Sequence, residues 1–79
     1  MSPTVFYHKG RRYFFFSREE TRRHIHVVSE KGEAKFWFQP IVSLADYTGF
    51  SVRELTEIER TIHEHRDEIE KAWKRHFQH

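Results

Sequence analysis

The chain has 79 residues, with 14 lysines and arginines against 12 aspartates and glutamates, and it has no cysteine. This length predicts one domain spanning 1–79, and the lack of cysteine excludes a disulfide framework and a thiolate zinc site. No apolar run approaches the roughly 20 residues of a membrane span, and the N-terminus is unlike a signal peptide, so we expect a cytoplasmic protein that does not enter a membrane.

The first 45 residues are more basic than the rest. They hold eight lysines and arginines against four glutamates, a formal charge of +4, whereas the remaining residues have six against eight, a charge of −2. The chain also has eight phenylalanines, three tyrosines and two tryptophans. A basic segment rich in aromatic residues is typical of nucleic-acid binding, and an ordinary solvated surface explains it equally well.

A first hairpin is predicted at the N-terminus. Residues 4–8 and 11–17 are rich in β-branched and aromatic residues, which favours strands. A two-residue turn at Lys9-Gly10 joins them and places Phe6 opposite Tyr13. The polar segment 18–23 that follows lacks periodicity and is predicted to be a loop. It is interpreted either as a mobile exposed loop or as a binding loop, whose Arg22 and Arg23 would hold a phosphate.

The segment 24–38 predicts a second hairpin with two different faces. A two-residue turn at Lys31-Gly32 would place Val28 opposite Lys35 and His26 opposite Trp37. The expected apolar face consists of Ile25, Val27, Ala34, Phe36 and Phe38. The expected polar face consists of His24, His26, Glu33, Lys35 and Trp37.

The last part of the chain predicts a helix. Pro40 ends the fourth strand, and residues 41–47 are expected to form a fifth short strand or an irregular segment. Ser51 and Glu54 fit a capping box, and large or apolar residues then recur at steps of three and four. This stripe contains Leu55, Ile58, Ile62, His65, Ile69, Ala72, Trp73 and Phe77. We therefore expect an α+β fold, in which an antiparallel sheet of four to five strands built from two hairpins (1–47) carries one long C-terminal helix (51–77) on one face.

The polar face of the second hairpin allows three interpretations. Two histidines two residues apart project from one face and would supply two metal ligands, but no third ligand is identified, and we predict no metal and no cofactor. Cleavage of RNA by its own 2′-hydroxyl needs a base, a cation and an acid, and Trp37 would stack a base if exposed. The candidates for those roles are His24, His26, Glu33, Lys35 and Arg12. In the third interpretation the histidines only form hydrogen bonds on a half-exposed sheet.

His65 falls within the apolar stripe of the helix, so it is expected to point at the sheet. It is either a core histidine held by a hydrogen bond or part of a site formed jointly by helix and sheet. The paired histidines are expected on the opposite face of the sheet. His65 would therefore join them only if the sheet curls strongly or if a second chain contributes.

Several segments carry a resemblance beyond this spacing. They are PTV at 3–5, HIHV at 24–27, GEAKFWF-x-P at 32–40, GFS at 49–51, and Glu64, His65, Ala72, Trp73, His76 and Phe77. Together they resemble the small prokaryotic family catalogued as domain of unknown function 4160, over nearly the whole chain. Members usually have prolines directly before the H-x-H pair, where this chain has Arg22-Arg23. The positions that match the family pattern and lack an obvious core role are His24, His26, Glu33, Lys35, Trp37 and His65.

The resemblance implies a toxin-like component of a gene pair similar to toxin–antitoxin operons, with suspected nuclease activity. The first hypothesis is therefore a metal-independent ribonuclease that binds RNA and a cognate small antitoxin-like protein. Its predicted catalytic residues are His24, His26, Glu33, Lys35 and His65, and its predicted nucleic-acid-binding residues are Arg12, Arg22, Arg23 and Trp37. The alternative is a non-catalytic interaction module that docks a small partner protein by its aromatic face or by an unpaired sheet edge. The sequence does not determine the oligomeric state.

Overall fold

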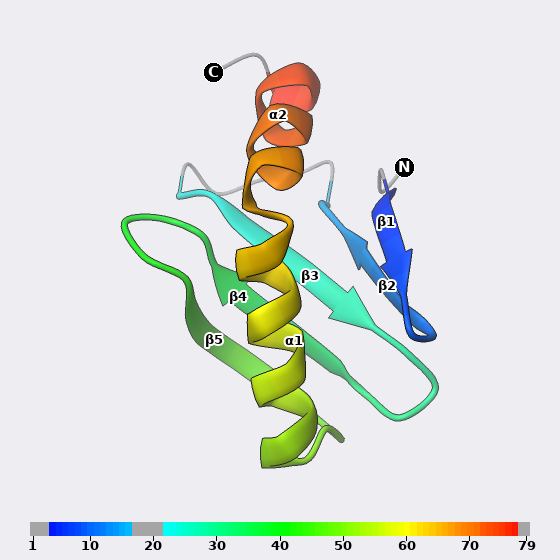
Figure 1. The fold of residues 1–79 in the computed structure, drawn as a ribbon. Coiled ribbons are helices and arrows are strands. Elements are labelled where there is room, and N and C mark those ends of the chain that lie inside the picture. Colours follow the sequence, from blue (N-terminus) through cyan, green and yellow to red (C-terminus); the bar gives the residue numbers. More distant parts are fainter. Residues whose placement is uncertain (1–3, 17–21, 78–79) are drawn as a thin grey trace.

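Five strands and two helices follow one another in a computed structural model that describes residues 4–16 and 22–77. The strands are β1 (Thr4–His8), β2 (Arg11–Phe14), β3 (His24–Val28), β4 (Glu33–Trp37) and β5 (Ser43–Thr48), and the helices are α1 (Val52–Glu64) and α2 (Arg66–Phe77). The strands are antiparallel and neighbour one another in chain order (Figure 1). The α+β class expected from the sequence is confirmed.

The β1–β2 connection has the geometry of a tight turn. Lys9 and Gly10 have φ angles of 51° and 76°, and positive φ at both central residues suits a two-residue hairpin turn. The strands pair Phe6 with Tyr13 and His8 with Arg11. These pairs are those that a turn at Lys9-Gly10 predicts.

The β3–β4 connection differs from the expected two-residue turn. His26 pairs with Lys35 and Val28 with Glu33, so four residues, 29–32, link the strands. The Ser29 amide donates to the Gly32 carbonyl over 2.9 Å across this link. The predicted register is therefore wrong by two residues. A shift of two leaves each side chain on its predicted face, because side chains alternate with a period of two.

Gly32 is needed for close packing against the end of β5. A Cβ atom at this position would lie 2.0 Å from the carbonyl oxygen of Thr48 and 2.9 Å from Cα of Gly49. The two glycines thus let the β3–β4 link pass directly against the end of β5. The Lys31-Gly32 pair marks this close approach and does not form a two-residue turn.

The fifth strand forms at residues 43–48, so the strand interpretation of this segment is confirmed with shifted ends. Its pairing with β4 is irregular, since Leu44 lies opposite Phe36 and Asp46 lies opposite Lys35. Ala45 is therefore an extra residue between two regular pairs. Such a bulge is one way in which an edge strand is kept from pairing with other chains.

The expectation of one long helix is wrong, because the chain breaks its helical path at His65. This residue has φ −106° and ψ 21°, so α1 ends before it and α2 begins after it. Its ring turns towards β1 and stacks on Phe6 at a centroid distance of 4.2 Å, and its Nδ1 lies 2.9 Å from Oε1 of Glu68. Neither proline nor glycine marks the break. Among the described residues, neither helix is long and apolar enough to cross a membrane.

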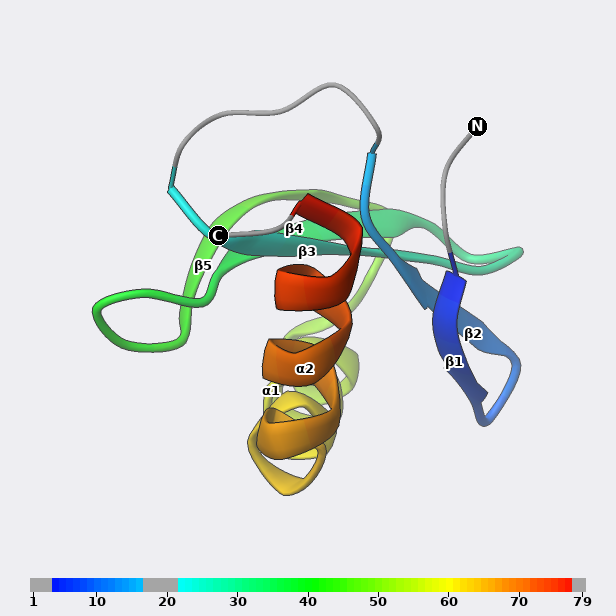
Figure 2. The same cartoon turned by 90° about the horizontal axis from the view of Figure 1, so that it is seen from above.

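Both helices lie on the same side of the sheet, and the β1–β2 hairpin curls round towards them (Figure 2). The predicted capping box is confirmed: Oγ of Ser51 accepts from the Glu54 amide, and Oε1 of Glu54 accepts from the Ser51 amide. Between helices and sheet lies the core. Its buried apolar residues are Tyr13, Phe15, Ile25, Val27, Ala34, Phe36, Phe38, Val42, Phe50, Ile58, Ile62, Ile69 and Trp73. The four core residues expected from the second hairpin, at 25, 27, 36 and 38, are all among them.

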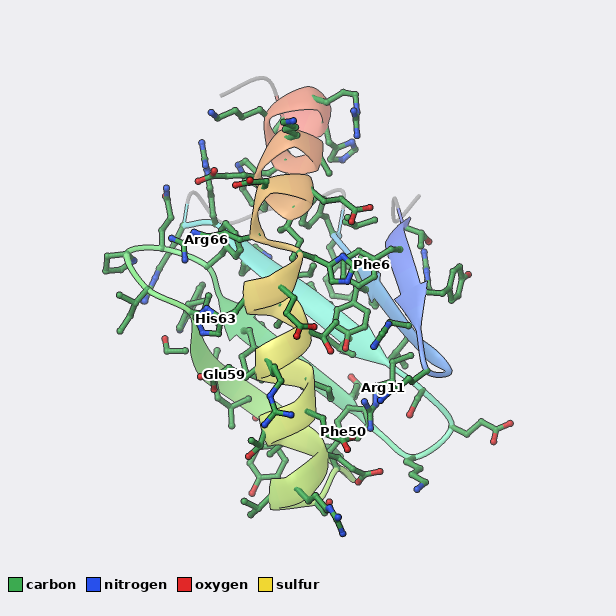
Figure 3. All side chains as sticks on the ribbon, in the orientation of Figure 1. Phe6, Arg11, Phe50, Glu59, His63 and Arg66 are labelled. Carbon is green, nitrogen blue, oxygen red and sulfur yellow. The ribbon has the colours of Figure 1, made fainter. Side chains whose placement is uncertain are left out.

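One buried charged side chain, that of Arg11, lies at the edge of the core. Arg11 is 8 % exposed and its Nη2 lies 3.1 Å from Oε1 of Glu57 on α1. Its guanidinium also lies 5.9 Å from the ring centroid of Phe50, the residue before the helix cap, and Figure 3 shows both side chains beside α1. Tyr13 is fully buried next to this pair, and burial raises the pKa of its hydroxyl. The basic strand β2 is thus anchored to the acidic first half of α1.

Candidate functional site

The sheet side that faces away from the helices, called the outer face here, carries a straight row of four side chains. Strand pairing places Phe14 of β2 opposite His26 of β3, His26 opposite Lys35 of β4, and Lys35 opposite Asp46 of β5. We call these four residues the central row. It brings an aromatic ring, a base, a cation and a carboxylate together from four consecutive strands.

Two further rows flank the central row. On one side the paired positions are Arg12, Val28, Glu33 and Thr48, and on the other side they are His24, Trp37 and Ser43. The polar positions predicted for the second hairpin therefore share one surface. Glu33 comes from this first flanking row and lies two residues from Lys35 along β4.

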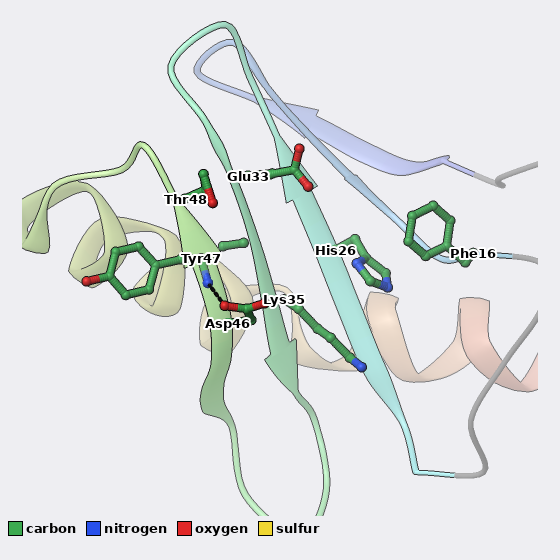
Figure 4. Close-up of a pocket in the computed structure, with 8 residues that line it drawn as sticks. Phe16, His26, Glu33, Lys35, Asp46, Tyr47 and Thr48 are labelled. Carbon is green, nitrogen blue, oxygen red and sulfur yellow. Dashed lines mark hydrogen bonds between the residues drawn. The ribbon is translucent and has the colours of Figure 1, made fainter.

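A pocket of about 160 Å³ opens on this surface. Its lining includes Phe16, His26, Glu33, Lys35, Asp46, Tyr47 and Thr48, which Figure 4 shows in place. Pockets that enclose a whole drug-sized ligand measure roughly 300 Å³ or more. By size, this pocket admits a group no larger than a phosphate and part of a sugar, and Glu33 and Asp46 place two carboxylates in its lining beside Lys35.

Aromatic rings fix the orientation of His26. Its ring centroid lies 5.5 Å from that of Phe14, 4.1 Å from that of Phe16 and 5.1 Å from that of His24. Phe16 is 46 % exposed and covers one side of the pocket. The sequence assigned Phe16 to a strand without a functional role. Its position beside His26 makes it an aromatic surface available to a ligand of this pocket.

His24 lies behind the pocket. It is only 3 % exposed, and its Nδ1 lies 2.8 Å from the carbonyl oxygen of Arg22. Because a carbonyl only accepts, Nδ1 carries the proton, and this hydrogen bond fixes the tautomer of a neutral ring. The ring also packs against Trp73 of α2 at 5.6 Å. The geometry therefore separates His24 from a ligand and places it edge-on against His26.

Trp37 is not an open stacking surface. The guanidinium of Arg22 lies 4.2 Å from its ring centroid and the ammonium of Lys35 lies 4.4 Å away. Stacking of a base was predicted only for an exposed Trp37, and the structure shows a half-buried ring. Its two neighbouring cations would attract a phosphate.

The predicted phosphate-binding arginines do not all lie on the outer face. Arg12 lies over Phe14 at 4.5 Å, and its Nε donates to Oγ1 of Thr4 over 2.7 Å. Arg23 instead has Nη1 3.9 Å from Oε2 of Glu70 on α2. Arg12 and Arg22 thus lie with the outer face, whereas Arg23 ties the start of β3 to the helix. Residues 18–21 of the predicted loop, and residue 17 at the end of the predicted second strand, lie outside the described residues.

His65 is separated from the pocket by the sheet. Its neighbours are Phe6, Glu68 and the ring of His8, whose centroid is 6.0 Å away, all on the helix side. The sheet does curl, but it carries β1 towards the helices (Figure 2). Strand pairing keeps His26 on the outer face. Of the five predicted catalytic residues, the structure therefore brings three together at the pocket: His26, Glu33 and Lys35.

Asp46 is a pocket residue that the sequence did not single out. Its position depends on the bulge at Ala45, which decides which residues of β5 face outward. Its Oδ1 accepts from the Tyr47 amide over 2.9 Å, which orients the carboxylate (Figure 4). Within 4–16 and 22–77, no three metal-ligating side chains come together in a cluster that would hold an ion.

Comparison with known proteins gives one match. A family model described as "Domain of unknown function (DUF4160)" matches residues 10–74, which covers every strand from β2 to β5 and most of both helices. Searches of the curated proteins and of the solved structures gave no significant match.

Proposed function

We propose that this chain, which belongs to the DUF4160 family of domains of unknown function, is a cytoplasmic, toxin-like, metal-independent ribonuclease that cuts single-stranded RNA on the outer face of its sheet. The observation that carries the proposal is the central row, which places a histidine beside a lysine over a pocket sized for one phosphate. The toxin-like role and the antitoxin-like partner rest on the resemblance described above.

In the proposed reaction His26 is the base. It accepts the proton of a ribose 2′-hydroxyl, whose oxygen then forms a bond to the adjacent phosphorus. The bond from phosphorus to the 5′-oxygen breaks, and that oxygen takes a proton from water at the open side of the pocket. The products are a 2′,3′-cyclic phosphate and a 5′-hydroxyl end, and no metal takes part.

Lys35 supplies positive charge for the phosphate as negative charge builds up on its oxygens. The Lys35 side chain runs away from Asp46 in Figure 4. Its ammonium lies over the ring of Trp37. The carboxylates of Glu33 and Asp46 line the other part of the pocket and repel a phosphate there. Together these charges direct the phosphate to the side of the pocket that His26 borders.

His24 acts on this reaction through His26, as a positioning residue. Its tautomer is fixed by the Arg22 carbonyl and its ring meets that of His26 edge to face. Phe16, exposed beside the same histidine, provides the surface on which a base next to the cut phosphate would stack. His65 has no part in the proposed reaction, because it lies on the helix side of the sheet.

The test compares cleavage of a single-stranded RNA by the wild type, His26→Ala and Lys35→Ala, in the presence of a metal chelator. We expect the wild type to leave 2′,3′-cyclic phosphate ends and each variant to lose at least about 100-fold in rate. His63→Ala is the matched control, since His63 is an exposed histidine on α1, paired with Glu59 at 3.8 Å (Figure 3). An RNA with one 2′-deoxy sugar should resist cleavage at that sugar alone.

Two results would refute the reaction. If the chelator abolishes cleavage, the reaction needs a metal, and if the products carry 5′-phosphates, the 2′-hydroxyl is not the nucleophile. If His26→Ala cuts RNA as fast as His63→Ala, His26 is not the base.

A second candidate function is a non-catalytic interaction module, and the edge strand β5 favours it. Apolar side chains are exposed along this edge: Ile41 is 66 %, Leu44 39 % and Tyr47 50 % exposed. A small antitoxin-like protein docking there would cover them. Co-purification of the wild type with the product of the adjacent gene, lost in Tyr47→Ser, together with no RNA cleavage by any preparation, would favour this module over the ribonuclease.

A further inference from the structure

A second open groove lies at the end of β4, apart from the pocket at His26. It has a volume of about 470 Å³ and is lined by Arg22, Gln39, Pro40 and Arg66. Arg22 comes from the segment before β3 and Arg66 is the first residue of α2, so two segments far apart in the sequence each contribute a guanidinium. Figure 3 shows Arg66 where α2 begins. No pattern in the sequence predicts that Arg22 and Arg66 lie at the same groove.

Each of the two guanidinium groups lies over an aromatic ring at the C-terminal end of β4. Arg22 lies over Trp37 at 4.2 Å, and Arg66 lies 5.5 Å from the ring centroid of Phe38. Trp37 is on the outer face, whereas the buried Phe38 belongs to the core on the helix side. The two arginines therefore approach the end of β4 from opposite sides of the sheet, and both line the groove at residues 39 and 40.

The groove arginines differ from the arginines that hold the fold together. Arg11 and Arg23 are paired with Glu57 and Glu70 at 3.1 and 3.9 Å. Among the described residues, no carboxylate lies within ion-pair distance of Arg22 or Arg66. The Nε of Arg22 donates to the carbonyl oxygen of Gln39 over 2.8 Å, which orients the guanidinium and leaves the N–H groups of both its Nη atoms for a ligand.

We infer that this groove is a phosphate-binding subsite, in which Arg22 and Arg66 hold one phosphate group between them. Planar guanidinium forks bind phosphate oxygens in pairs, and attraction to an aromatic ring helps to hold each guanidinium at the groove. Lys35 shares the ring of Trp37 with Arg22, so positive charge continues from the pocket at His26 to the groove. In the proposed function, which this inference extends, the phosphate belongs to the RNA backbone a few nucleotides from the cut.

The experiment measures binding of a single-stranded RNA of about ten nucleotides at several salt concentrations, with 2′-O-methyl sugars so that cleavage does not interfere. The variants are Arg22→Gln, Arg66→Gln and Arg66→Lys, with the exposed helix residue Arg60→Gln as the matched control. Each lost phosphate contact should lower the slope of log K against log salt by about 0.7. We expect Arg66→Gln and Arg22→Gln to bind about five- to tenfold more weakly with this lower slope, Arg66→Lys to fall between, and Arg60→Gln to match the wild type.

Inorganic pyrophosphate serves as a second probe, since it offers the same chemistry without RNA. Weaker pyrophosphate binding in Arg66→Gln, with unchanged RNA binding, assigns the groove to a small free phosphate ligand and overturns its link to RNA. Unchanged binding of both probes in Arg22→Gln and Arg66→Gln, with folding verified by thermal unfolding, overturns the subsite itself.

The subsite and the ribonuclease can fail separately. If the wild type does not cut RNA, yet Arg66→Gln loses RNA affinity and salt dependence, the subsite stands and the ribonuclease does not. If His26→Ala abolishes cleavage while Arg66→Gln retains full RNA affinity, the ribonuclease stands and the subsite does not.

Discussion

His24 and His26 meet edge to face, with ring centroids 5.1 Å apart and ring planes at 87°, although the two residues alternate along one strand and share a face. The difference in their exposure separates their roles. His24 is buried against Trp73 of α2, whereas His26 borders the pocket. An H-x-H pair read from sequence as two equivalent groups is therefore one buried ring beside one half-buried ring that borders the pocket.

This relationship predicts the behaviour of His24→Phe, a variant that keeps a ring of similar size but loses the hydrogen bond to the Arg22 carbonyl. A positioning residue that does not touch RNA should change kcat and not KM. We expect kcat for RNA cleavage to fall about tenfold with KM within twofold, and the pH profile of kcat to shift, because the surroundings of His26 change. The measurement is steady-state cleavage between pH 5 and 8.

His26→Phe is the matched comparison, and it should remove cleavage almost entirely. An equal loss in both variants would assign His24 a direct chemical role. A raised KM with unchanged kcat in His24→Phe would instead indicate that His24 contacts the RNA.

The assignment of side chains to the two faces was predictable from the sequence, because it depends only on alternation. The slip of two residues between β3 and β4 changed the cross-strand partner of His26 from Trp37 to Lys35 and still kept each face intact. Neighbours within a face were harder to predict. Asp46 joins the pocket through a bulge at Ala45, and a bulge has no reliable signature in one sequence.

The break between the two helices could not be predicted from the sequence, for a different reason. The stripe of large residues continues through residue 65, so the periodicity indicates one helix. The break coincides with a tertiary contact of His65 with Phe6. The same contact removes His65 from the proposed site. Tertiary contacts of this kind link distant parts of the chain, and local pattern and propensity do not report them.

Gly32, in the link between β3 and β4, gives a prediction that is independent of function. In Gly32→Ala the added Cβ would meet the Thr48 carbonyl oxygen at 2.0 Å, so the backbone of β5 must move. We expect a loss of at least about 2 kcal/mol in the free energy of unfolding, measured by urea denaturation, since overpacking against backbone is not relieved by a side-chain rotation.

Gly10→Ala is the control for this loss. Gly10 has φ 76° and nothing within 4 Å of an added Cβ, so the substitution costs only the left-handed backbone strain of about 1 kcal/mol. A Gly32→Ala variant no less stable than Gly10→Ala would mean that β5 does not pass so closely against the link.

The ion pair between Arg11 and Glu57 gives a pH-dependent prediction. The hydrogen bond from the Arg11 guanidinium is the main cause that lowers the pKa of the Glu57 carboxyl below its usual value. A carboxyl with a lower pKa in the folded state stabilises the fold above the pKa of the unfolded chain, and this stability disappears as the pH falls through the folded pKa. Glu57→Gln should therefore be less stable than the wild type at pH 7, and the difference should vanish near pH 2.

Urea midpoints across this range measure the effect, with Glu64→Gln as the matched control on the same helix. Some acid sensitivity should remain in Glu57→Gln, because the Ser51 backbone N–H, donating to the Glu54 carboxylate, also lowers the pKa of that group. The double variant Glu54→Gln/Glu57→Gln should therefore be the least sensitive of the four between pH 5 and 2. If Glu57→Gln is destabilised equally at both ends of the range, its loss comes from packing and not from the charge on the carboxylate.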